Sequence, residues 1–243
     1  MRRYADLNLR VPLNNLPHTE TMVKNAHKLG YSLIAIPFSP YVRQEQINQL
    51  RNICYKSNTE LATRVNFSPR TSNELLHSLR RFRRKFEIIS VMCNTKDVAR
   101  QAAKDRRVDL LQFSATNLKK RFFDEAEAEL ASQVFSSLEI EIAPLLQLES
   151  SSRIRLLSRL QKEALLAEKF NVPIVISSGA KNEYQMRGPR EYAAFVSLFD
   201  LQLSSALKAV SENPYALVER NRQKLSSEYV APGIRVVGRR GVA

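Results

Sequence analysis

The sequence predicts an α/β barrel of the TIM-barrel-like type, with about seven parallel strands and surrounding helices. Short apolar segments alternate with amphipathic helical patterns along the 243 residues, and this alternation is typical of a parallel sheet. A barrel of about 250 residues routinely forms one unit. We therefore expect a single domain over residues 1–225, followed by a basic C-terminal extension over 226–243 that ends in GRRGVA.

The expected elements follow in order along the chain. Strands are expected at residues 4–10, 32–38, 60–67, 86–93, 108–114, 137–146 and 172–178. Helices are expected at 19–29, 43–56, 72–85, from Thr95 onward, 124–132, 152–170, 189–199, 203–210 and 214–225. The last helix is expected to begin with Asn213 as its N-cap. No eighth strand is evident, and the segment 234–237 is either a late edge strand or an ordered tail.

The first expected strand carries polar residues in a row. Alternation places Asp6, Asn8 and Arg10 on one side, and Ala5, Leu7 and Leu9 on the other. A row of this kind could ligate a divalent cation if it read Asp-x-His-x-His. An amide and an arginine stand at the two histidine positions, and arginine cannot coordinate a metal.

The histidines do not suggest a metal centre elsewhere. His18, His27 and His77 lie in a loop and on two outer helices, where a solvated or partly packed side chain is expected. Cys54 and Cys93 are expected to be reduced and buried. The sequence therefore predicts neither a metal site nor a redox site on this chain.

The sixth expected strand carries Glu139 and Glu141 on one side. Two buried carboxylates could serve acid–base chemistry. The simpler interpretation is a set of barrel-interior residues that pair with Arg or Lys. The chain also has no GxxxxGK or GxGxxG segment for a nucleotide phosphate.

The charge balance favours a polyanionic partner. Lys and Arg number 38 against 24 Asp and Glu, which leaves a net charge of +14. No apolar run approaches the roughly 18 residues that span a bilayer, and the N-terminus lacks the apolar segment of a signal peptide. We expect a cytoplasmic protein that does not contact a membrane.

The densest group of cations is RRFRRK at residues 80–85. Phe82 continues the apolar stripe of Leu75, Leu76 and Leu79, so the arginines are expected to fan outward. Arginine binds phosphate oxygens through two parallel hydrogen bonds. The residues predicted to bind RNA on this face are Arg80, Arg81, Arg83, Arg84 and Lys85.

Two further groups flank the fifth expected strand. Lys119, Lys120 and Arg121 follow it, whereas Arg106 and Arg107 precede it. Because opposite ends of one barrel strand lie at opposite mouths, we expect two separate contact regions.

A last group surrounds the end of the seventh expected strand. Lys181, Arg187 and Arg190 lie near a helix that begins at Pro189. The group could form an anion site at the helix start. The alternative is a tight turn that needs Gly179 and Gly188, and both interpretations stay open.

Four segments taken in order carry a family resemblance: YADLNLRVP, NVPIVISSGAKN, RGPREYAAF and ENPYALVERNR. Over residues 1–225 the chain resembles the ribonuclease P protein subunit with a TIM-barrel-like fold, called component three in archaea and the thirty-kilodalton subunit in eukaryotes. That fold is similar to the polymerase-and-histidinol-phosphatase (PHP) hydrolases, whose first strand carries HxH and whose late strand ends in Asp-x-His. This chain has Ser178, Gly179 and Ala180 at the late position.

The resemblance implies an RNA-binding subunit of ribonuclease P without catalytic residues of its own. The RNase P RNA would hold the magnesium ions and remove the 5′ leader of precursor tRNA, which this chain would contact only indirectly. A small RRM-like subunit and other RNase P proteins are the implied protein partners, and no cofactor is implied on this chain. The alternatives are a metal-dependent phosphoesterase that uses Asp6, Glu139 and Glu141, and a barrel that binds another structured RNA.

Overall fold

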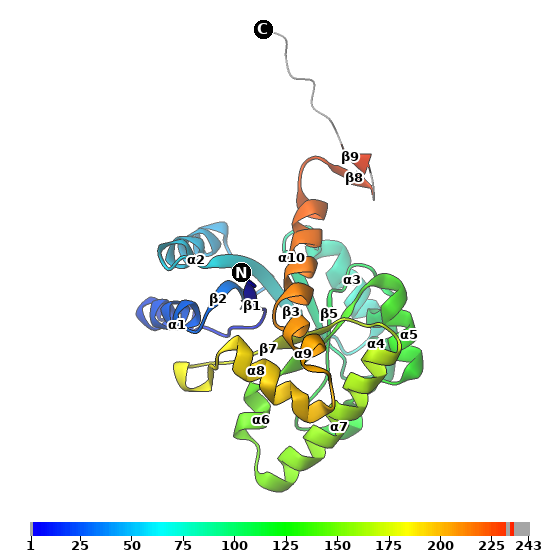
Figure 1. Cartoon of the computed structure of the whole chain (residues 1–243). Coiled ribbons are helices and arrows are strands. Elements are labelled where there is room, and N and C mark those ends of the chain that lie inside the picture. The colour runs from blue at the N-terminus through cyan, green and yellow to red at the C-terminus, as the bar shows by residue number, and fades with distance from the viewer. Residues whose placement is uncertain (1, 232–233, 236–243) are drawn as a thin grey trace.

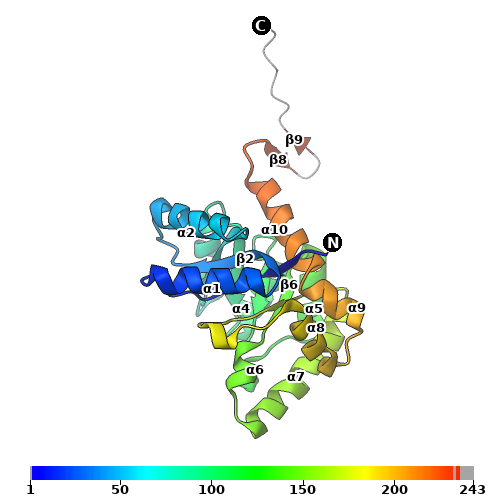
Figure 2. The ribbon, with the colours of Figure 1, turned by 60° about the vertical axis from the view of Figure 1, so that its left-hand side comes forward.

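The computed structural model describes residues 2–231 and 234–235. Seven parallel strands form one sheet in chain order, β1 to β7, and helices surround it (Figures 1 and 2), as the sequence predicts. The strands are β1 (Tyr4–Asp6), β2 (Tyr31–Phe38), β3 (Glu60–Phe67), β4 (Ile88–Met92), β5 (Leu110–Gln112), β6 (Ser137–Glu141) and β7 (Ile174–Ser177).

The helices agree with the expected ones within a few residues. Three short elements, α6, η1 and η2, are additional, and the sixth strand ends at Glu141 rather than at residue 146 because α6 follows it. The α-helices are α1 (Leu16–Lys28), α2 (Gln44–Lys56), α3 (Ser72–Phe82), α4 (Lys96–Lys104), α5 (Glu125–Val134), α6 (Ala143–Gln147), α7 (Ser150–Lys169), α8 (Pro189–Val196), α9 (Leu203–Ala209) and α10 (Glu212–Leu225). Three single turns of 3₁₀-helix are η1 (Leu118–Lys120), η2 (Glu183–Gln185) and η3 (Ser197–Phe199).

The strands are staggered, as a barrel requires. Glu60 of β3 is level with Leu33 of β2, whereas β4 begins level with Arg64. Such a stagger tilts the strands and curls the sheet toward closure. It also brings the ends of non-neighbouring strands into one polar layer at the C-terminal mouth.

Backbone contacts outside the sheet bring the first strand near the last. The Arg10 N–H donates to the carbonyl of Ala180 at 2.9 Å, and the Ala5 N–H donates to the carbonyl of Val210, just after α9, at 3.0 Å. Within residues 2–231 no eighth strand joins the barrel sheet. The barrel is therefore nearly closed, and the residue after α9 supplies a hydrogen-bond acceptor to the free edge of β1.

Helix α10 closes the N-terminal mouth and crosses the strand starts in Figure 1. Its side chains Tyr215, Leu217 and Val218 pack into an interior cluster with apolar residues from β1 to β5 and β7. Burial of this apolar face fixes the helix on the barrel. The sequence predicted Asn213 as the N-cap of α10, and this prediction is wrong. Ser211 precedes the helix, and the Asn213 amide donates to the carbonyl of Ile174 at 2.8 Å.

A second, larger core lies between the outer surface of the strands and the helices around them. Helix α3 shows the pattern, because it buries Leu75, Leu79 and Phe82 and begins at Thr71, whose hydroxyl accepts from the Glu74 N–H at 3.2 Å. Thr95 caps α4 in the same way, as expected. Both cysteines are free and buried, in agreement with the sequence, and burial raises the pKa of the Cys54 thiol to about 12.

Beyond α10 the chain forms a small ribbon of β8 (Tyr229–Ala231) and β9 (Ile234–Arg235), which pair with each other and not with the barrel. The rest of the expected C-terminal extension, residues 232–233 and 236–243, lies outside the described residues. None of the described helices is long and apolar enough to cross a membrane.

Candidate nucleic-acid interface

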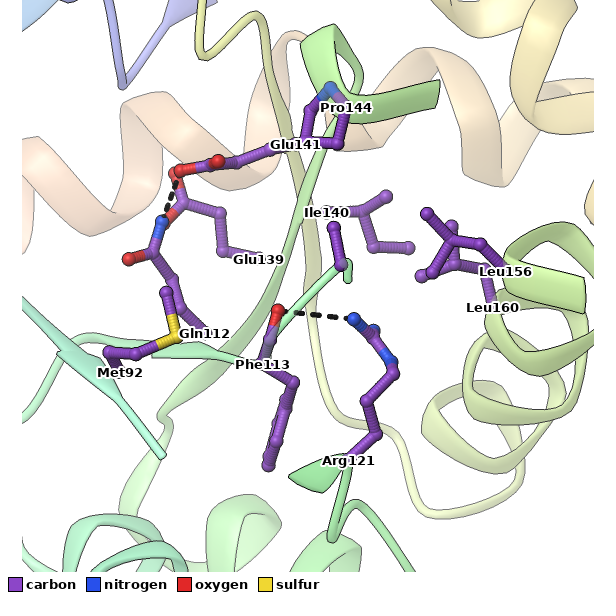
Figure 3. A pocket seen from close by; sticks show the side chains of 11 residues that line it. Met92, Gln112, Phe113, Arg121, Glu139, Ile140, Glu141, Pro144, Leu156 and Leu160 are labelled. Carbon is purple, nitrogen blue, oxygen red and sulfur yellow. Dashed lines mark hydrogen bonds between the residues drawn. The ribbon is translucent and has the colours of Figure 1, made fainter. Parts of the chain in front are cut away.

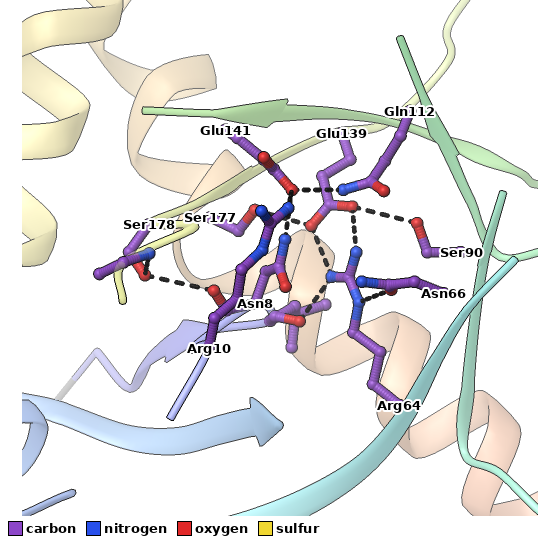
Figure 4. Close-up of polar contacts among 12 residues, drawn as sticks. Asn8, Arg10, Arg64, Asn66, Ser90, Gln112, Glu139, Glu141, Ser177 and Ser178 are labelled. Carbon is purple, nitrogen blue, oxygen red and sulfur yellow. Dashed lines mark hydrogen bonds and ion pairs between the residues drawn. The ribbon is translucent and has the colours of Figure 1, made fainter. Parts of the chain in front are cut away.

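At the C-terminal mouth, an ion pair occupies the centre of the barrel (Figure 4). Arg64 on β3 binds both carboxylate oxygens of Glu139 on β6, each at 2.6 Å, and both side chains are 0% exposed. Ser177 and Ser90 also donate to this carboxylate, at 2.7 and 3.3 Å. The guanidinium is held in turn by Asn66. Every carboxylate oxygen therefore has a partner, which a buried charge requires.

A second carboxylate, Glu141, lies above this pair at the edge of the mouth. One of its oxygens accepts hydrogen bonds from the side chains of Asn8, Arg10 and Gln112 (Figure 4). Burial raises the pKa of Glu141, and the neighbouring Glu139 raises it further. Both glutamates thus follow the simpler interpretation, as interior residues neutralised by arginines.

The Asp6 side chain does not point to Glu141 as those of Asn8 and Arg10 do, but accepts from the backbone. Strand β1 ends at Asp6, whose carboxylate accepts from the backbone N–H groups of Asn8 and Ser178 at 3.1 and 2.9 Å. Leu7 lies in the interior core and Leu9 in the outer one. The expected alternation is confirmed for Ala5 and Leu7, which share the interior core, and is wrong for Leu9, because the strand ends at Asp6 and the chain leaves the sheet.

A small pocket opens beside this network (Figure 3). It measures about 60 Å³ and is lined by Glu139, Glu141, Gln112 and apolar side chains of β6 and α7. Ligand pockets are typically about 300–1,000 Å³. In the described part of the chain no group of three or more His, Cys, Asp or Glu is placed to hold a metal ion. The phosphoesterase alternative is disfavoured, because arginines bind both of the glutamates that it would use as ligands.

The end of α3 presents most of the RRFRRK cations to solvent. Arg80, Arg81 and Arg84 are exposed, and none of them takes part in an ion pair among the described residues. The guanidinium carbon of Arg81 lies 5.2 Å from the centroid of the Tyr41 ring, and this ring is packed edge-on against Phe82. Tyr41 itself is 66% exposed.

Arg83 does not fan outward as expected, and Lys85, although exposed, has its ammonium bound to the backbone. The side chain of Arg83 is 14% exposed and pairs with Asp109 at 2.6 Å. The Lys85 ammonium donates to the carbonyls of Pro40 and Val42, each at 2.9 Å. The reason is tertiary: these acceptors come from segments far away in the sequence.

The groups around β5 lie at opposite ends of the strand, as predicted. Lys119 and Lys120 are exposed on η1. Arg121 is not: its side chain is 4% exposed and pairs with the buried Glu163 of α7. Arg121 therefore ties η1 to α7, and its expected place on the RNA-binding surface is wrong. On the other side of β5, Arg107 pairs with Asp105 at 2.6 Å, whereas Arg106 is exposed.

The third group is centred on the start of α8. Lys181, Arg187 and Arg190 are exposed, but the Glu191 carboxylate accepts from the Gly188 N–H at 2.7 Å. This acidic side chain already occupies one of the backbone donors that an anion at the helix start would use. Gly188 has φ −66°, which any residue adopts.

Gly179, by contrast, is required by its conformation. Its φ is +62°, and a Cβ there would lie 3.3 Å from a carboxylate oxygen of Glu141. The tight-turn interpretation accounts for Gly179, whereas it does not account for Gly188.

Sequence reasoning missed several residues of this surface and of the mouth. Arg64 was detectable as a charged residue in the middle of a largely apolar strand. Arg220 and Lys224 of α10 were not singled out, although they stand one helical turn apart and follow the ENPYALV segment. Tyr41 gave no local signal, because its contact with Arg81 depends on the packing of α3.

These features define a basic TIM-barrel-like protein whose C-terminal mouth is filled with arginine–carboxylate contacts. Fold comparison agrees: the chain is similar to a putative prolidase from Bifidobacterium longum, with a TM-score of 0.60 and 10% identity over 91% of this chain and 70% of that one. A closer likeness is to a chain in a cryo-EM structure of archaeal ribonuclease P with mature tRNA. There the TM-score is 0.85 with 23% identity, over 98% of this chain and 99% of that chain.

The model of the family RNase P subunit p30 matches residues 3–226, and the chain belongs to this family. Ribonuclease P protein component 3 of Methanosarcina mazei is 34% identical over 163 residues, which are 67% of each chain. The chain is accordingly a protein subunit of ribonuclease P, the enzyme that matures tRNA 5′ ends.

Proposed function

We propose that this subunit supports the RNase P RNA through phosphate contacts and contributes no catalytic residue. The observation that carries the proposal is the distribution of charge. The carboxylates of the barrel mouth, Glu139 and Glu141, are bound to Arg64 and Arg10, while Arg80, Arg81 and Arg84 remain exposed at the end of α3. Arginines without acidic partners suit phosphate oxygens.

Lys119 and Lys120 extend the proposed contact surface to η1, and Lys181, Arg187 and Arg190 extend it to the start of α8. Phosphate contacts from several faces are what a protein that stabilises a folded RNA needs. The RNA would hold the magnesium ions and cleave the precursor tRNA. A small RRM-like subunit and the other RNase P proteins are the proposed protein partners, and precursor tRNA would be bound mainly through the RNA.

The test compares the affinity for RNase P RNA over a range of salt concentrations. The variant is Arg80→Gln, Arg81→Gln and Arg84→Gln, which leaves the buried pair of Arg83 intact. Each lost phosphate contact lowers the slope of log affinity against log salt by about 0.7 to 0.9, so we expect a slope that is smaller by about 2 to 3.

The matched control replaces three exposed cations on α7 and α9, namely Arg155→Gln, Lys162→Gln and Lys208→Gln. It carries the same change in net charge. Equal slopes for the two triple variants would remove the α3 face from the interface.

A further inference from the structure

Three distant segments converge on one carboxylate at the N-terminal mouth of the barrel. Asp109, directly before β5, is buried and accepts from the Arg83 guanidinium at 2.6 Å, the Arg220 guanidinium at 3.4 Å and the Asn221 amide at 2.8 Å. Its backbone position is fixed as well, since the Asp109 N–H donates to the carbonyl of Ile89 at 3.0 Å. Asp109 therefore joins the end of α3 and the middle of α10 to the start of β5.

Two more cations stand beside this junction. Arg106 lies in the turn that Arg83 contacts through the carbonyl of Arg107, at 3.5 Å. Lys224 follows Arg220 by one turn of α10. Burial lowers the pKa of Lys224, and the nearby charges of Arg220, Arg83 and Arg106 lower it further, against the opposing effect of Asp109. Lys224 therefore lies within the electrostatic reach of the three arginines.

The positive charge at this place is not balanced within the described structure. Two of the four cations, Arg83 and Arg220, bind Asp109, whereas the nearby Glu87 carboxylate is turned toward Thr63 and Arg222. Neither Arg106 nor Lys224 makes a side-chain hydrogen bond to any of the described residues. Like charges held in a partly buried site repel one another, so an anion bound there would be stabilised.

The adjacent residue favours a nucleic acid over other anions. Arg220 donates to the carbonyl of Phe135 at 3.0 Å. Phe135 ends α5 in the left-handed conformation, with φ +61°, and is 67% exposed. An exposed aromatic side chain whose own backbone is bonded to one of the cations is suited to stack an unpaired base while the cations bind the phosphate.

The geometry points to a binding site for an RNA phosphate at the N-terminal mouth of the barrel, formed by Arg106, Arg220 and Lys224 and positioned by Asp109 and Arg83. This inference rests on the proposed function, because it takes the polyanion to be the RNase P RNA. It adds α10, which presents two of the three cations, to the contact surface. The guanidinium of Arg220 donates only two of its five N–H groups to the described residues, so others remain for phosphate oxygens.

The experiment uses the full chain and the double variant Arg106→Gln, Lys224→Gln, which leaves the Asp109 contacts in place. RNase P RNA affinity is measured against salt, with Lys162→Gln, Lys208→Gln as the control of equal charge. We expect the slope of log affinity against log salt to fall by about 1 to 2 in the double variant and to stay nearer the wild-type value in the control. Phe135→Leu should weaken binding without changing the slope.

A second measurement separates this site from RNA binding in general. Inorganic pyrophosphate should raise the melting temperature of the wild-type chain and of the control more than that of the Arg106, Lys224 variant. Equal RNA slopes and equal pyrophosphate effects in both double variants would overturn the site, while the α3 face could still bind RNA. If polyglutamate displaced the RNA as well as single-stranded RNA does, an acidic protein segment would replace RNA as the partner. A wild-type chain that fails to bind RNA at all would instead refute the proposed function.

Discussion

Arg64 and Glu139 form a bidentate ion pair inside the barrel, between β3 and β6, with both side chains fully buried. In this chain the positive charge at the mouth is supplied by Arg64 and Arg10, which the protein carries permanently. The pair therefore joins opposite sides of the sheet.

Removing one partner of this pair should destabilise the protein strongly. Arg64→Met leaves the Glu139 carboxylate buried and unpaired, and breaking such a pair costs about 3–5 kcal/mol. The double variant Arg64→Met, Glu139→Met leaves no unpaired charge, so its free energy of unfolding, measured by urea titration, should be closer to the wild-type value than that of Arg64→Met. A single variant as stable as the double variant would show that the pair does not balance the buried charge.

Replacing the carboxylate at the edge of the mouth should leave cleavage nearly intact. Glu141→Gln keeps the shape of the side chain that contacts Asn8, Arg10 and Gln112. We expect reconstituted ribonuclease P with this variant to cleave precursor tRNA within a few-fold of the wild-type rate. General acid–base residues contribute about 10²–10⁴-fold, so a loss of that size in a folded, assembled particle would contradict the assignment of catalysis to the RNA. Asp6→Asn offers a parallel test.

The pH dependence of stability should contain a contribution from Glu127 on α5. Burial raises its pKa to about 7, although Arg100 pairs with it at 2.9 Å. The folded state therefore binds more protons than the unfolded state between about pH 4.5 and 7, and the free energy of unfolding falls as pH rises through this window. The loss is at most about 3 kcal/mol. Glu127→Gln should remove this component, and identical pH profiles for variant and wild type would refute the raised pKa.

The backbone at the start of α8 should not hold a lone anion while Glu191 caps it, so Lys181, Arg187 and Arg190 would contact RNA phosphates through their side chains alone. Sulfate is expected to raise the melting temperature of wild type and of Arg190→Gln equally, because the Gly188 N–H is already bonded to the Glu191 carboxylate. In Glu191→Ala the loss of the cap should cost roughly 1 kcal/mol, and sulfate should then stabilise the variant more than wild type. A selective effect of sulfate on wild type over Arg190→Gln would show that the anion site exists despite the cap.

The sequence by itself determined the barrel. Its repeated exchange of apolar strands and amphipathic helices fixes the order of seven strands, and local signals such as Thr95 at the start of α4 mark where helices begin. It also determined that Asn8 and Arg10 cannot replace metal-binding histidines, because ligand chemistry depends on residue type alone. These properties follow from spacing and composition within short segments.

Only the tertiary structure decided which cations face solvent. Arg83 and Arg121 belong to basic runs, yet each turns inward to an acidic residue at a distant point of the chain, Asp109 and Glu163. Arg80 and Lys119 remain exposed. The physical reason is that burying a charge requires a partner in three dimensions. Short sequence patterns record the charge of each residue but not the partner that the fold brings to it.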